Sequence, residues 1–138
     1  MKWVTESRPH VDRCASAWFI QRFVDPKADF RFVNRGEEVP DDCTPYDLPS
    51  VPLGHKGSRV TFDAFLAKYP RRDRALARMA DLVRDIDLGG FRLTESHGLD
   101  TLLFALLLAE PDDQAVLRLT HVLFEGLYRY FGGAERPS

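Results

Sequence analysis

The sequence has few cysteines and no long apolar run. Cys14 and Cys43 are the two cysteines among 138 residues. They are too few for a disulfide framework, which favours reduced thiols in a cytosolic protein. Residues 1–6 lack the apolar stretch of a signal peptide, and the longest apolar run, residues 102–109, is far shorter than the ~20 residues of a transmembrane helix. We therefore expect a cytoplasmic protein that makes no membrane contact.

An excess of charge of one sign is also absent. The 19 basic side chains nearly balance the 21 acidic ones, for a net charge of −2, and both kinds are spread over both halves of the chain. This balance argues against nucleic-acid binding by this domain. The arginines between residues 71 and 78 have no aromatic residues among them, which is more typical of a solvated helix face.

Several catalytic motifs are missing. The sequence contains no nucleophile elbow, P-loop, dinucleotide fingerprint or paired CxxC motif. These absences remove the common hydrolase, NTPase, Rossmann and thiol-redox classes.

Apolar residues make up 44% of the chain, enough for one core in a single domain over residues 1–138. Alternation predicts strands at 3–5 and 30–33, and short strands near 46–48 and 58–60. Helical periodicity and capping residues predict five helices. They begin at Asp12, Thr61, Asp73, near Leu99, and at Asp112 or Asp113, and residues 85–90 form a loop. The fold class is α+β, a helix-rich single domain with a small sheet from the N-terminal half.

One histidine stands out because glycines flank it closely. His55 follows Gly54 and precedes Gly57, and Asp63 comes eight residues later at a predicted helix start. Glycine permits backbone conformations that could aim the imidazole at a target. The pair could bind a metal or share a proton. Alternatively, His55 is a loop residue bonded to the backbone, and Asp63 complements the helix dipole.

Three more carboxylates have unusual settings. Asp85 and Asp87 are predicted near the end of a helix, where acids oppose the dipole unless a cation pairs with them. Glu95 precedes the apolar helix and is either a ligand or an ordinary cap residue. Together with His55 and Asp63, these oxygens predict a divalent metal site of the Fe(II) or Mn(II) type rather than a thiolate zinc site.

The N-terminal segment around Arg8, Asp12 and Arg13 is a second candidate. The arginines flank a predicted helix start, where free N–H groups and guanidinium forks both favour anions. Arg13 could instead pair with a buried acid. On the last predicted helix, His121 and Glu125 have a spacing that can chelate, although a plain charged face explains them equally well.

Blocks along nearly the whole chain resemble the chromate-resistance protein family, the C-terminal domain of ChrB. The blocks are residues 3–5, 8–9, 11–13, 15–25, 30–33, 45–49, 53–57, 61–63, 75–78, 85–88, 95, 98 and 127–128. The resemblance implies an association with chromate resistance or chromate-responsive regulation. The resemblance also singles out the candidate residues that lie inside these blocks, namely Arg8, Asp12, Arg13, His55, Asp63, Asp87 and Glu95. Many relatives carry a cysteine where this chain has Ser16, and some where it has Val60, so thiol chemistry is disfavoured here.

We consider three functions. In the first, His55, Asp63, Asp87 and Glu95 bind Fe(II) or Mn(II), and Arg8, Asp12 and Arg13 form the catalytic surroundings of a small anionic substrate in a metal-dependent redox enzyme. In the second, the same residues form an oxyanion- or metal-sensing module without turnover. In the third, His55 and Asp63 act as a metal-free acid–base pair. An oligomer is compatible with all three.

Overall fold

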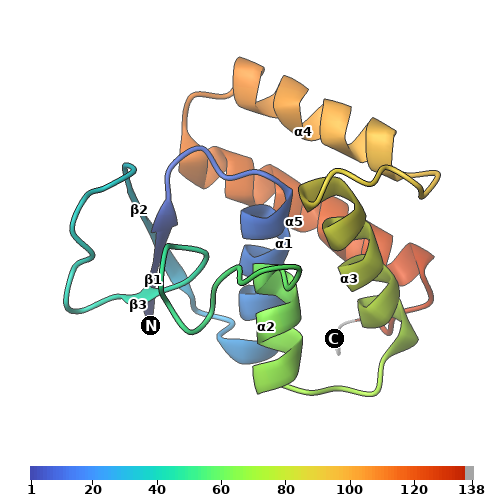
Figure 1. Cartoon of the computed structure of the whole chain (residues 1–138), viewed down its shortest axis with the longest axis horizontal. Coiled ribbons are helices and arrows are strands. Elements are labelled where there is room, and N and C mark those ends of the chain that lie inside the picture. The colour runs from blue at the N-terminus through green and yellow to red at the C-terminus, as the bar shows by residue number, and fades with distance from the viewer. Residues whose placement is uncertain (136–138) are drawn as a thin grey trace.

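The N-terminal strand is the centre of the sheet. In the computed structural model, which describes residues 1–135, β1 (Lys2–Glu6) lies between β2 (Asp29–Val33) and β3 (Thr44–Pro45). All pairings are parallel, and Trp3 lies opposite Phe30 on one side and Thr44 on the other. The helices lie to one side of this small sheet (Figure 1), and the predicted α+β class and the origin of the sheet in the N-terminal half are confirmed.

The helix after β1 forms the middle of the molecule. Every residue of α1 (Val11–Phe19) except Arg13 is buried, and the chain continues as a π-helical segment, η1 (Ile20–Val24). Such burial is expected because apolar side chains cover nearly the whole circumference of this helix. Three of the remaining helices contact α1, namely α2 (Thr61–Lys68), α3 (Arg74–Asp87) and α5 (Asp113–Tyr130), whereas α4 (Ser96–Ala109) packs against α3 (Figure 1).

Some element ends differ from the sequence prediction. Asp12 lies inside α1 and His10 occupies the N-cap, while Val60 rather than Thr61 caps α2. The strand predicted near residues 46–48 lies slightly earlier, as β3, because Asp47 has a positive φ of 49° that ends the extended chain. Residues 58–60 contribute only an isolated bridge between Lys56 and Arg59.

Helix α4 is unusually apolar for its exposure. Leu99 and Leu103 are buried, whereas Leu102, Phe104 and Leu108 are 62%, 54% and 90% exposed. Figure 1 shows α4 lying across one end of the molecule. Within residues 1–135, no helix is both long and apolar enough to span a bilayer.

Candidate metal centre

Three segments far apart in the sequence bring one imidazole and two carboxylates together. Asp12 comes from α1, His55 from the loop before α2, and Asp87 from the last residue of α3. One ligand atom from each residue lies within 4.8 Å of the other two. Among residues 1–135, this is the one group of metal-ligating side chains that meets this distance, so it is the candidate metal centre.

The position of the centre follows from the parallel sheet. The carboxyl ends of parallel strands lie at the same edge of the sheet, where α/β proteins commonly place ligands. Glu6 ends β1, and Asp47 follows shortly after β3. Arg13 in the first turns of α1 reaches both, with its guanidinium 3.8 Å from the Glu6 carboxylate and 3.5 Å from that of Asp47.

The loop holds the His55 ring in one tautomer. Its Nε2 lies 2.8 Å from the carbonyl oxygen of Gly57, and because a carbonyl can only accept, Nε2 carries the hydrogen. The lone pair of a neutral ring is then on Nδ1, which lies 3.3 Å from an Asp87 carboxylate oxygen. Two acceptors facing each other require either a proton or a cation between them, and a metal-binding histidine commonly donates its other N–H in this way.

The flanking glycines are required by the loop geometry. Gly57 has a φ of +61°, which L-residues rarely adopt, and a Cβ at Gly54 would lie 3.0 Å from the Val51 carbonyl oxygen. The Gly-flanked histidine noticed in the sequence is therefore fixed by backbone constraints on both sides.

Asp12 is the buried carboxylate of the centre. It is 3% exposed, and its two oxygens accept hydrogen bonds from the backbone N–H groups of Thr61 (2.8 Å) and Phe62 (2.9 Å). Asp12 thus caps α2 rather than the helix it belongs to. Burial, followed by the nearby Asp47 charge, raises the pKa of Asp12 to about 7, against the lowering effect of the two backbone hydrogen bonds.

The two acids at the end of α3 have different roles. Asp85 accepts hydrogen bonds from the backbone of Arg92 and Leu93 and from the Ser96 hydroxyl, and these bonds, that of Ser96 first, lower its pKa. Asp87 faces His55 instead. At the negative end of the helix dipole, the Asp87 carboxylate is compensated only by a positive partner.

Sequence reasoning missed Asp47. Burial raises the pKa of this carboxyl, against the lowering effect of the Arg13 charge, and both Asp87 and His55 influence it electrostatically. Its backbone N–H donates to the Leu53 carbonyl (2.8 Å), which ties the residue to the loop that carries His55. The available signal was an aspartate in the family block at residues 45–49, but assignment of this segment to a strand concealed it.

Asp63 and Glu95, both predicted as ligands, lie outside the cluster of three. The Asp63 carboxylate binds the Arg84 guanidinium and accepts from the backbone N–H of Val60 at 3.3 Å. Glu95 occupies the N-cap of α4 without a capping hydrogen bond from its side chain. The expected acid–base pairing of His55 with Asp63 therefore has no geometric support, since Asp87 is the acid beside the imidazole.

The structure places Arg8 at the junction of α4 and α5. Its guanidinium donates to the carbonyl oxygens of Leu107 (2.6 Å), Glu110 (2.8 Å) and Pro111 (2.9 Å), and to the Asp113 carboxylate (2.9 Å). These bonds satisfy the C-terminal end of α4. Of the two arginines assigned to anion handling, Arg13 therefore lies beside the centre, whereas the guanidinium of Arg8 is occupied elsewhere.

Two surface hollows meet at His55. One, of about 380 Å³, is lined in part by Arg13, Arg35 and Asp47. The other, of about 510 Å³, is lined in part by Lys56 and Arg59. Glu6 and Asp47 in the first hollow offset the charge of Arg13. The cations that favour an approaching anion are therefore Arg35 in that hollow and Lys56 and Arg59 in the other.

Comparison with known proteins identifies the family of the chain. The family described as "ChrB, C-terminal domain" matches residues 3–131, and the chain belongs to that family. Protein ChrB of Cupriavidus metallidurans is 32% identical over 136 residues, which cover 98% of this chain and 42% of that protein. The chain thus spans less than half the length of this curated relative. No solved structure matches the chain.

Proposed function

We propose that the chain binds a divalent metal ion, Fe(II) or Mn(II), through Asp12, His55 and Asp87, and that a small anionic ligand or substrate approaches this ion. The proposal is carried by one observation: the three ligand atoms lie within 4.8 Å of one another. One imidazole nitrogen and two carboxylate oxygens, with no thiolate, suit these ions better than a structural zinc site.

The protein's own groups would orient the ligands. Gly57 fixes the His55 tautomer, and the N–H groups of Thr61 and Phe62 hold the Asp12 carboxylate. When bound, the metal would supply a Lewis-acidic centre with positions left open for a ligand. Arg13, with its charge shared between Glu6 and Asp47, and the exposed Arg35 would attract the anion.

The family context supports an oxyanion as the ligand class. The resemblance to chromate-resistance proteins implies a role in chromate or metal stress, and chromate is a small dianion of the kind that arginines bind through several hydrogen bonds. Both cysteines are free thiols, and Cys14 is buried, which is compatible with the proposed cytoplasmic location.

Elemental analysis tests the metal site. Protein purified without a metal-binding tag should contain about one iron or manganese per chain, and His55→Ala should remove it while the chain stays folded. His97→Ala is the matched control, because His97 lies on α4 and stacks on Phe91 at 4.5 Å between ring centroids. Full metal occupancy in His55→Ala would refute the assignment. Absence of metal from the wild type after reconstitution would leave His55 with an acid–base or structural role.

A non-catalytic sensing module is the second candidate, and the cationic hollows beside His55 favour it. A sensor should show a thermal shift with chromate, molybdate, sulfate or phosphate without forming a product. Arg35→Gln should reduce this shift, whereas Arg72→Gln, which removes an equal charge outside these hollows, should not. No shift with any of the four anions would count against a sensor, and product formation would favour the enzyme.

A further inference from the structure

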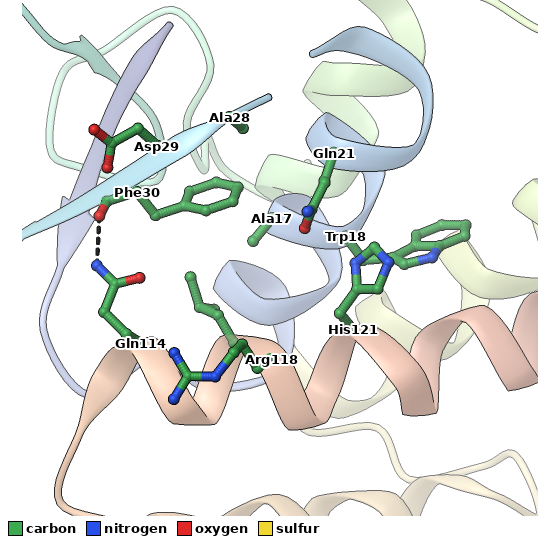
Figure 2. Close-up of a pocket in the computed structure, with 10 residues that line it drawn as sticks. Ala17, Trp18, Gln21, Ala28, Asp29, Phe30, Gln114, Arg118 and His121 are labelled. Atoms are coloured by element: carbon green, nitrogen blue, oxygen red, sulfur yellow. Dashed lines mark hydrogen bonds between the residues drawn. The ribbon is translucent and has the colours of Figure 1, made fainter. Parts of the chain in front are cut away.

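A third hollow, of about 250 Å³, lies between α1, β2 and α5 (Figure 2). None of the residues that line it belongs to the metal centre or to the two hollows beside His55. Its volume is below the range of about 300–1,000 Å³ that is typical of sites for drug-sized ligands. Any ligand that it encloses is therefore small.

Part of the wall is apolar and rigid. Trp18, Phe30 and Leu117 line the hollow and are 1%, 7% and 7% exposed. The indole of Trp18 is fixed because its Nε1 donates to the Glu125 carboxylate at 3.0 Å. This wall is preformed, so an apolar ligand body would bind without ordering these side chains first.

Polar side chains occupy the other part of the wall. Gln114 and Arg118 are four residues apart on α5 and so share one face of the helix, while Gln21 approaches from η1 (Figure 2). Gln114 donates to the Phe30 carbonyl at 2.6 Å, which fixes its amide. Within residues 1–135, neither the Gln21 amide nor the Arg118 guanidinium has a hydrogen-bond partner, and both therefore have donors for a ligand.

The charge of Arg118 is not neutralised by the described part of the chain. The carboxylate among the lining residues, Asp29, is engaged by Arg31 through two hydrogen bonds of 2.7 Å and 3.2 Å. No carboxylate of residues 1–135 forms an ion pair with Arg118. A guanidinium fork matches a carboxylate through paired hydrogen bonds.

We propose that this hollow is a binding site for a small organic carboxylate with an apolar body. Arg118 would bind the carboxylate, Gln21 would donate a further hydrogen bond, and the wall of Trp18, Phe30 and Leu117 would contact the apolar body. An inorganic oxyanion would leave that wall without a partner, and a nucleotide exceeds the volume.

Benzoate is a suitable probe, because it joins a carboxylate to a compact apolar ring. Calorimetric titration should show saturable binding, and the tryptophan fluorescence, to which Trp18 contributes, should change with the same midpoint. Benzamide, of nearly the same shape but uncharged, should bind at least about tenfold more weakly. The metal-free and metal-loaded proteins should bind benzoate alike, which separates this site from the proposed metal function.

Two variants test the assignment to this hollow. Arg118→Gln should weaken benzoate binding at least about tenfold, whereas Arg72→Gln should leave it unchanged. Ala28→Leu keeps the arginine but fills part of the hollow and should also weaken binding, so the test stands even if Arg118→Gln fails to fold. No binding isotherm up to about 10 mM benzoate, or equal binding by the wild type, Arg118→Gln and Ala28→Leu, would overturn the proposal.

Discussion

At the scale of single residues, Asp12 has two functions in the structure. Its carboxylate caps α2 through the N–H groups of Thr61 and Phe62, and it offers an oxygen to the cluster with His55 and Asp87. The sequence identified Asp12 as a candidate site residue and predicted that the flanking glycines orient the His55 imidazole. It gave no sign that Asp12 caps a helix some 50 residues later, because that contact depends on how α1 packs on α2.

The raised pKa of Asp12 predicts a pH dependence of the metal-free protein. The unfolded chain releases this proton near pH 3.8 and the folded protein only near pH 7. The protonated Asp12 carboxyl therefore makes its full contribution to the free energy of unfolding below pH 3.8. This contribution falls by roughly 1.4 kcal/mol for each pH unit as the pH rises from 3.8 and is lost once the pH has passed through 7. Asp12→Asn, which cannot ionise, should remove this dependence in urea unfolding at pH 4.5, 6 and 7.5. An unchanged pH profile in the variant would contradict this account of Asp12.

Asp85 and Asp87 provide a matched pair of neighbouring acids. Asp85→Ala removes hydrogen bonds to Arg92, Leu93 and Ser96 and should lower the melting temperature while metal content is retained. Asp87→Ala relieves an acid at a helix C-terminus and should remove the metal with little change in the stability of the metal-free chain. Melting curves and metal analysis of both variants measure the contrast. Loss of metal in Asp85→Ala, with a lowered melting temperature in Asp87→Ala, would contradict these assignments.

At the scale of elements, periodicity and capping residues predicted the helices well. Asp73 caps α3 by accepting from the N–H groups of Ala75 and Leu76, and Asp112 caps α5, as the sequence indicated. The third strand was displaced because residues 44–48 lack an alternating pattern and Asp47 adopts a left-handed conformation. The π-helical turn at η1 could not be predicted, since no residue type in Ile20–Val24 specifies it.

Arg8 affects a whole element, because its guanidinium donates hydrogen bonds to the carbonyl oxygens at the C-terminal end of α4. Arg8→Ala removes its bonds to the carbonyl oxygens of Leu107, Glu110 and Pro111 and to Asp113, and should cost roughly 1–3 kcal/mol of unfolding free energy. Metal content should not change. Urea unfolding and metal analysis are the measurements, with Arg92→Ala as a charge-matched control. Loss of metal at unchanged stability would restore Arg8 to the site.

At the scale of the whole molecule, one core contains the two tryptophans and half of the phenylalanines, and the helices bring distant site residues together around it. The sequence predicted the layers but not the proximity of Asp12, His55 and Asp87, which follows from α1 contacting both α2 and α3. The match to the family of the ChrB C-terminal domain covers residues 3–131 and so includes all three residues. The packing brings them to one place.

Helix α4 tests this description of the core. Leu103 is 2% exposed and Leu108 is 90% exposed, although both are leucines of the same helix. Leu103→Ala should cost about 2–5 kcal/mol of unfolding free energy, and Leu108→Ala less than about 0.5 kcal/mol. Denaturant unfolding of the two variants provides the comparison. Equal costs would mean that α4 buries a different face.

The most direct test of the metal centre is anomalous diffraction from crystals of the manganese- or iron-loaded protein, with data collected on both sides of the metal absorption edge. We predict one anomalous peak within bonding distance of His55 Nδ1 and of an oxygen from each of Asp12 and Asp87. A peak at Asp63 and Glu95 instead, or no peak in crystals of protein with full metal content, would contradict the central claim.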